Sequence, residues 1–265
     1  MASLTRHTVD GVTLLGGASR PGGVAFAFTE RTGGVSAGAH ASLNLGDACG
    51  DDPACVRENR RRALAALSPK ADPARLVNPL QVHGDKVVCI TADDPESLAA
   101  AQAEARSGAD AVAVSVPGVP VLLCYADCVP VMIVAEGGFA VVHSGWKGTY
   151  ARIAGTAAAD LAAITGAHPR TMSAYIGPHI LGGEYAVDPG LAERFAAAFG
   201  ARVLVGARNV DLGSCIASTL VDAGLDAACI FDDEISCFSN PDRFFSYRAS
   251  GGTCGRHGAL AIMEG

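Results

Sequence analysis

Near its middle the chain reads Ala126-Asp127-Cys128-Val129-Pro130-Val131-Met132-Ile133-Val134-Ala135-Glu136-Gly137-Gly138-Phe139-Ala140-Val141-Val142-His143. Two short apolar runs flank a glycine-containing turn, and this pattern predicts two strands that pair as an antiparallel hairpin. Because the runs are apolar at nearly every position, we expect both faces of these strands to be covered.

The hairpin also brings two reactive side chains towards each other. With the turn centred on Glu136 and Gly137, Pro130 lies opposite His143, and Cys128 lies one diagonal step beyond that pair. Neighbours of this kind are roughly 5 to 8 Å apart. Cys128 and His143 are therefore close enough to share a metal ion or a hydrogen bond.

A second histidine, His83 in Gln81-Val82-His83-Gly84, completes a possible set of three metal ligands. Three protein ligands suit a catalytic zinc, because the fourth position stays open for water or substrate. Nothing in the spacing brings His83 to the hairpin, however. A cysteine in an apolar strand is more often inert, and a lone histidine is more often a hydrogen-bonded surface or core residue, so both interpretations stay open.

The hairpin runs into Gly145-Trp146-Lys147-Gly148, where a turn leads into a helix. The free N–H groups of a helix start could hold a phosphate or carboxylate, with Lys147 as the countercharge. Alternatively, Trp146 packs the helix start against the sheet and Lys147 is solvated.

The rest of the chain alternates between helical and strand patterns. Proline and acidic residues open helices, and glycine ends one of them. We expect helices over 53–67, 95–106, 149–164, 189–199 and 212–222. We expect further strands over 24–29, 171–176, 203–205, 228–231, 244–248 and 259–263. No linker or repeat divides the chain, so the sequence predicts a single α+β domain over residues 1–265, with a mixed sheet flanked by helices.

Composition narrows the class of protein. The 265 residues are 49% hydrophobic and 18% charged, with a net charge of −7 and no long basic run, which argues against nucleic-acid binding. Arginines 57, 60, 61 and 62 are expected on a solvated helix face. The odd count of nine cysteines indicates a reducing compartment. Without a signal-peptide pattern or an unbroken apolar span, we expect a cytoplasmic protein that does not enter membranes, as a monomer or weak homo-oligomer.

Short motifs along nearly the whole chain carry a family resemblance. They are FTERTGGVS (28–36), SLNLG (42–46), GDDP (50–53), ENR (58–60), QVHG (81–84), ADA (109–111), ADCVP (126–130), VHSGWKG (142–148), IGP (176–178) and FFSYR (244–248). In their number and order they resemble the YfiH-like family, whose members are labelled laccase-domain or polyphenol oxidase proteins, purine nucleoside phosphorylases and peptidoglycan editing factors. The chain departs from the family's usual pattern at Ser144, Lys147, Ile216 and Ala249-Ser250.

The resemblance implies a compact α+β fold distantly similar to bacterial toxin deamidases. It implies a catalytic zinc held by His83, Cys128 and His143. It also implies phosphorolysis of adenosine, inosine and methylthioadenosine to the free base and ribose 1-phosphate, together with adenosine deamination. On that basis Arg31 and Lys147 would hold phosphate or the sugar hydroxyls, and Asn44 would hydrogen-bond the nucleoside.

Other functions stay open at this point. The family also includes hydrolytic editing of a peptidoglycan precursor that carries a misincorporated serine, in which Cys128 would be the nucleophile and His143 the base. Copper-dependent oxidation of phenols is a third possibility, since one cysteine and two histidines suit a single copper. Four-copper laccases need far more histidines than the seven here. The non-enzymatic alternative is a nucleotide- or partner-binding module with a structural metal.

Overall fold

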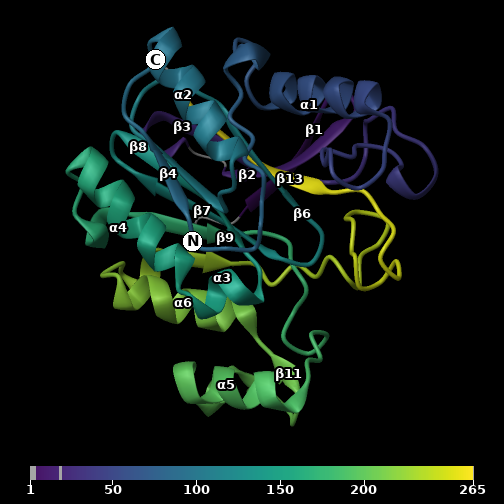
Figure 1. Cartoon of the computed structure of the whole chain (residues 1–265), viewed down its shortest axis with the longest axis vertical. Helices are drawn as coiled ribbons and strands as arrows, with labels where there is room; N and C mark the ends of the chain where they lie inside the picture. Colours follow the sequence, from purple (N-terminus) through teal and green to yellow (C-terminus); the bar gives the residue numbers. More distant parts are fainter. Residues whose placement is uncertain (1–3, 18–19, 265) are drawn as a thin grey trace.

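Two β-sheets packed face to face form the centre of the computed structural model, which describes residues 4–17 and 20–264 (Figure 1). One sheet is antiparallel throughout, in the order β1-β2-β3-β13-β6. The other is mixed, in the order β12-β9-β7-β8-β5-β4, with a parallel pair at each end. The strands are β1 (Leu4–Val9), β2 (Val12–Gly17), β3 (Val24–Thr29), β4 (Val87–Ile90), β5 (Ala111–Val114), β6 (Val121–Tyr125), β7 (Val129–Ala135), β8 (Gly138–Ser144), β9 (Ser173–Ile176), β12 (Ile230–Asp232) and β13 (His257–Met263), with β10 (Leu204–Val205) and β11 (Asn209–Val210) as a separate ribbon.

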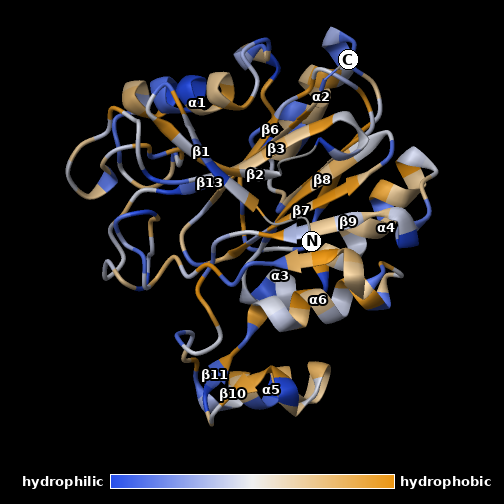
Figure 2. Ribbon diagram, turned by 180° about the vertical axis from the view of Figure 1, so that it is seen from behind, coloured by the Kyte–Doolittle hydropathy of each residue, from blue (hydrophilic) through white to orange (hydrophobic). Residues whose placement is uncertain are grey.

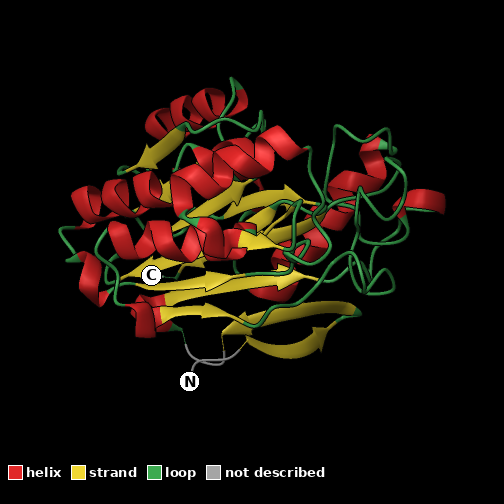
Figure 3. Ribbon diagram, turned by 90° about the horizontal axis from the view of Figure 1, so that it is seen from below, coloured by secondary structure: helices red, strands yellow, loops and turns green. Residues whose placement is uncertain are grey.

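Helices pack along the layered strands (Figure 3). They are α1 (Pro53–Leu67), α2 (Pro95–Arg106), α3 (Trp146–Tyr150), α4 (Ile153–Thr165), α5 (Pro189–Phe199) and α6 (Leu212–Asp222). Helix α1 packs on the outer face of the antiparallel sheet, and α4 and α6 cover the outer face of the mixed sheet. Helix α5 packs against the β10–β11 ribbon and the α3 region instead. The expected α+β class with a mixed sheet flanked by helices is confirmed, and the antiparallel sheet adds a fourth layer. No helix in the described part of the chain combines the length and apolar composition that crossing a membrane requires.

The predicted hairpin is β7 and β8, at the middle of the mixed sheet. Pro130 pairs with His143 and Ala135 with Gly138, which is the register expected from the turn. Every residue of both strands is buried, and they carry the hydrophobic colour in Figure 2. One face of the hairpin packs against the antiparallel sheet and the other against α4, which explains why the runs do not alternate.

Four predicted helices have the expected bounds because their start signals are local. Aspartates 52, 94, 188 and 211 each cap a helix by accepting a backbone N–H with the side chain, and three of them precede a proline. The predicted helix 149–164 is instead two helices, α3 and α4. The break falls at Arg152, which has a left-handed backbone with φ of 63°.

The strand predicted over 244–248 is wrong, since this segment is irregular and ends in a turn. Phe244 and Phe245 are fully buried, and the Asp127 carboxylate holds the residues after them through the Ser246 hydroxyl and the Arg248 N–H. The strands predicted over 203–205 and 228–231 are shorter and follow a 3₁₀ turn. Strands β1, β2, β4 and β11 were not predicted. Cys89 on β4 is exposed, and all nine cysteines are free thiols.

Candidate metal centre

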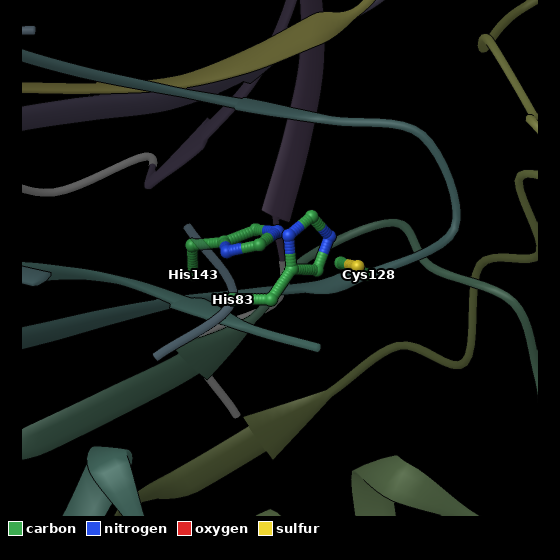
Figure 4. A group of neighbouring side chains, drawn as sticks. All are labelled: His83, Cys128 and His143. Carbon is green, nitrogen blue, oxygen red and sulfur yellow. The ribbon is translucent and has the colours of Figure 1, made fainter. Parts of the chain in front are cut away.

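His83, Cys128 and His143 converge at one end of the β7–β8 hairpin (Figure 4). Their ligand atoms all lie within 4.8 Å of one another. The two imidazole rings are nearly perpendicular, at 82°, with centroids 4.9 Å apart. The structure therefore brings together the three residues singled out in the sequence, including His83, which the hairpin alone could not place.

The Asp110 carboxylate, just before β5, explains how the His83 loop is held. It accepts backbone N–H groups from Val82 at 3.2 Å, His83 at 3.0 Å and Gly84 at 2.7 Å. A buried carboxylate that accepts several backbone donors stays charged and fixes the loop around it. Although burial alone would raise the pKa of Asp110, His143 and these donors outweigh it and the pKa is lowered.

Asp110 also orients His143. Its Oδ1 lies 2.8 Å from Nδ1 of the imidazole, and both side chains are almost fully buried. This contact leaves Nε2 as the nitrogen available to a metal, an arrangement typical of metal-binding histidines. One carboxylate thus positions two of the three candidate ligands.

Cys128 and His143 form a charged pair in the protein without metal. Burial alone would raise the pKa of the Cys128 thiol, but the charge of His143 and hydrogen bonds with both histidines outweigh it and lower the pKa to about 6. Burial also opposes the charged form of His143, yet Cys128 and Asp110 raise its pKa to about 9. At neutral pH Cys128 is accordingly a thiolate, the form that binds metals and attacks electrophiles.

Two turns that carry the ligands have left-handed backbones at residues other than glycine. His83 has a φ of 59°, and Asp127, directly before Cys128, has a φ of 85°. The Asp127 carboxylate accepts the Ser246 hydroxyl at 2.5 Å and the Arg248 N–H at 2.6 Å. Asp127 therefore fixes both the Cys128 turn and the loop across from it.

Gly145 keeps the space beside the three ligands open. A Cβ at this position would lie 3.0 Å from His83 Cδ2 and 3.1 Å from Cys128 Sγ. Its φ of −74° is accessible to any residue, so the need for glycine here is one of space. A larger residue would occupy the volume next to the ligand atoms.

The three ligands open into a cleft of about 580 Å³. Its walls combine apolar and aromatic side chains with two arginines, Arg248 and Arg256. The other lining residues are Gly46, Asp47, Ala48, Cys49, Asn78, Pro79, Leu80, Gln81, Cys124, Ala126, Asp127, Trp146, Ile180, Tyr185, Leu212 and Tyr247. A cleft of this size and character is typical of a small-molecule site.

Arg31 lies outside this lining and is already engaged. Its guanidinium donates to the carbonyls of Ala41, at 2.8 and 2.6 Å, and Pro241, at 2.8 Å, and it stacks over Phe245. These contacts give Arg31 a structural role.

Asn44 and Lys147 also lie outside the cleft lining. Asn44 is fully buried, where its amide group donates to Gly46 O and to Asp51. Lys147 is exposed, and its ammonium lies 5.6 Å from the Trp146 ring. Within the segment 145–148, Trp146 lines the cleft, and it also packs on the hydrophobic core.

Asp110, Tyr247 and Arg248 were not among the site residues predicted from the sequence. Asp110 lies between two alanines at the start of an apolar strand, and a carboxylate buried there needs hydrogen-bond donors or a positive charge. A carboxylate in so apolar a segment was therefore the sequence signal for a functional or structural role of Asp110. Tyr247 and Arg248 belong to a segment predicted as a strand, which hid their position at the cleft.

Comparison with known proteins adds to this geometry. A family model described as multi-copper polyphenol oxidoreductase laccase matches residues 25–264. The chain belongs to this family. It is 38% identical over 242 residues to a Deinococcus radiodurans protein named purine nucleoside phosphorylase, with 89% of this chain and 88% of that protein covered. A Mycobacterium tuberculosis protein of the same name is 35% identical over 241 residues, with 89% and 90% covered.

Solved structures share the fold of this chain. YlmD from Geobacillus stearothermophilus has a TM-score of 0.82 and 28% identity, with 99% of this chain and 100% of that chain covered. The Bacillus licheniformis hypothetical protein YfiH has a TM-score of 0.86 and 24% identity, with 97% of each chain covered. The YfiH-like resemblance inferred from the motifs is confirmed. The names of the curated relatives indicate an enzyme.

Proposed function

We propose that the protein is a zinc-dependent enzyme that cleaves purine nucleosides by phosphorolysis and also deaminates adenosine. The observation that carries the proposal is a set of three candidate ligands in the lining of a cleft large enough for a small molecule. The curated relatives named purine nucleoside phosphorylase support the substrate class. The expected substrates are adenosine, inosine and methylthioadenosine, with the free base and ribose 1-phosphate as products.

The donor set fits a zinc ion. Two imidazoles and a thiolate are ligands that zinc prefers, and Gly145 leaves room beside them. His83, Cys128 and His143 would hold the ion, which when bound would supply Lewis-acid chemistry that activates water near neutral pH.

Other residues of the cleft would bind and orient the substrates. Arg248 and Arg256 place positive charge where phosphate must approach, and the rings of Trp146, Tyr185 and Tyr247 offer apolar surface for a purine. In this proposal they replace Arg31, Asn44 and Lys147, which have other partners or lie outside the cleft.

The direct test is to incubate the zinc-loaded protein with inosine and phosphate and to measure hypoxanthine by chromatography. We expect base release that depends on phosphate and is lost after treatment with a chelator. About one zinc per chain should be retained by the wild type and lost in Cys128→Ala. Cys229→Ala, at a free cysteine outside the cleft, is the matched control. Wild-type protein with stoichiometric zinc that releases no base would contradict the proposal.

A second candidate function is hydrolytic editing of a peptidoglycan precursor. The Cys128 thiolate beside His143, which is in turn held by Asp110, has the order of nucleophile, base and orienting carboxylate found in cysteine hydrolases. Hydrolysis of a serine-containing precursor by metal-free protein, with loss of activity after alkylation of Cys128, would favour this candidate over the first.

Copper-dependent phenol oxidation is the third candidate. Among the described residues, His83, Cys128 and His143 form the one group of metal-ligating side chains close enough to hold an ion, which leaves room for a single copper at most. Metal analysis of protein purified without added metal separates zinc from copper. Action as a single domain, a cytoplasmic location and a monomeric or weakly associated state remain predictions.

A further inference from the structure

A second cavity, of about 630 Å³, lies between α1 and α2. Two of its residues, Asp47 and Asn78, also line the metal cleft, so the two spaces adjoin. The remaining lining residues are Arg57, Arg60, Arg61, Leu64, Pro73, Leu76, Gln102 and Arg106. We call this cavity the arginine groove.

The arginine groove is strongly basic on an acidic protein. Four arginines and a single carboxylate line it, although the chain has a net charge of −7. Hydrophilic colour marks the middle turns of α1 in Figure 2. Such a local excess of positive charge attracts anions. Arg57 and Arg61 are exposed on α1, as the sequence predicted for this helix face, and the same face forms one wall of the groove.

The existing ion pairs leave much of this charge uncompensated. Asp47 is shared between Arg60, at 3.4 Å, and Arg106, at 3.2 Å. Arg61 pairs with Glu58 at 2.8 Å. Among the described residues, no carboxylate pairs with the exposed guanidinium of Arg57.

One buried polar atom in this lining, Oδ1 of Asn78, has no hydrogen-bond partner in the described structure. Nδ2 of Asn78 donates to Leu122 O at 2.8 Å, so the side chain is fixed while its oxygen stays without a donor. Nε of Arg60 donates to Leu45 O at 2.8 Å, and its buried Nη2 has the ion pair with Asp47 at 3.4 Å but no hydrogen bond. Buried polar atoms normally have hydrogen-bond partners, and an anionic ligand with a hydroxyl group offers an acceptor for Nη2 and a donor for Oδ1.

We propose that the arginine groove binds a phosphate group of a ligand that also reaches the metal cleft. Arginine matches phosphate through parallel charge-assisted hydrogen bonds. The inference rests on the proposed function for the reacting part of the ligand, and it makes a phosphorylated nucleoside a better ligand than the free nucleoside. The phosphate bound in the groove can belong to the nucleoside or be free inorganic phosphate, in addition to the reacting phosphate proposed at Arg248 and Arg256.

Calorimetry of the zinc-loaded protein with adenosine, adenosine 5′-monophosphate and inorganic phosphate tests this inference. Arg57→Gln, Arg106→Gln and the double variant remove exposed charges, whereas Arg60 supports the fold through Leu45 and is left intact. Arg170→Gln, an exposed arginine outside the groove, is the matched control. Thermal unfolding checks that each variant is folded.

We expect the monophosphate to bind at least tenfold more tightly than adenosine, and each groove variant to weaken it by about tenfold. Arg170→Gln should leave the affinity unchanged. If inorganic phosphate binds and its affinity falls in the same variants, the groove binds free phosphate. If only the monophosphate binds and loses affinity in these variants, the bound phosphate group is part of the substrate.

Equal affinity of the double variant and wild type for both phosphates would overturn the inference, and so would the absence of phosphate binding to the wild type. Because binding is measured without turnover, this result is separate from the proposed function. A protein that binds the monophosphate through these arginines but releases no base from inosine would retain the groove and lose the phosphorolysis proposal.

Discussion

Asp110 is the single residue on which the candidate metal centre depends most. Its carboxylate accepts the backbone donors of the His83 loop and contacts Nδ1 of His143. Asp110→Asn keeps the size of the side chain but loses the charge and one acceptor oxygen. We expect zinc affinity to fall roughly 10- to 100-fold, as for other partners of metal-binding histidines.

A competition titration against a chelator measures this affinity. Asp222→Asn, which removes an exposed carboxylate paired with Arg152, should leave zinc affinity unchanged. An Asp110→Asn variant with wild-type affinity would show that the His83 loop and His143 are positioned by other contacts.

His257 predicts a pH-dependent contribution to stability. It is fully buried near the rings of Tyr125 and Phe244, and neither ring nitrogen has a hydrogen-bond partner in the described structure. Burial lowers the pKa of His257 to about 4. The unfolded chain therefore binds a proton at higher pH than the folded one, so stability is present above about pH 6.5 and lost as pH falls towards 4.

The expected loss over this range is up to about 3 kcal/mol of the free energy of unfolding. Urea unfolding of wild type and His257→Leu at several pH values measures it, because other titrating groups are common to both proteins. The exposed His7→Gln is the control. Parallel pH profiles for wild type and His257→Leu would refute the prediction.

At the level of elements, the sequence predicted the segments whose structure depends on local signals, but it did not predict those whose structure depends on distant contacts. The β7–β8 hairpin and the helices that begin with proline were predicted correctly because their turn, cap and strand signals lie within each segment. The segment 244–248 was misassigned because its conformation depends on a distant residue: Ser246 and Arg248 donate hydrogen bonds to Asp127, which lies 119 and 121 positions away. The pairing of Cys128 with His143 was local in the same sense, whereas the position of His83 depends on Asp110 and was given only by the family resemblance.

The loop 246–248 gives a prediction at this level. Asp127→Asn suits the left-handed backbone but weakens the acceptor of the Ser246 hydroxyl and the Arg248 N–H. We expect faster hydrogen exchange at the Arg248 amide and a higher KM, with zinc retained, because Tyr247 and Arg248 lose their fixed position.

Amide exchange followed by mass spectrometry or NMR measures the change. Asp226→Asn, at the cap of a short 3₁₀ turn, serves as a control for loss of a similar hydrogen bond elsewhere. Unchanged protection at Arg248 would assign the order of this loop to Phe244 and Phe245 instead.

For the whole molecule, metal binding and folding are linked. The candidate ligands come from the His83 loop, the Cys128 turn and β8, which meet only when the chain is folded. At a free concentration 100 times its Kd, an ion that binds only the folded state adds about 2.7 kcal/mol to the free energy of unfolding. For a chain of this length, this corresponds to a rise in Tm of roughly 5 to 10 °C.

Thermal unfolding with zinc and with a chelator measures this rise. Cys128→Ala should abolish the difference between the two conditions, and Cys229→Ala should preserve it. Equal Tm values for the wild type in zinc and in chelator would mean that the folded protein does not bind the ion at this site.

The left-handed backbones at His83 and Asp127 give the candidate site a built-in strain. Each conformation costs about 1 kcal/mol in a residue with a side chain, and the contacts of Asp110 and of the 246–248 loop hold it in place. Glycine would relieve that strain but would give each turn more conformational freedom, so ion binding would have to order the ligands. With His83 and Asp127 at these positions, the folded chain is slightly less stable, but its ligands are already in place before an ion binds.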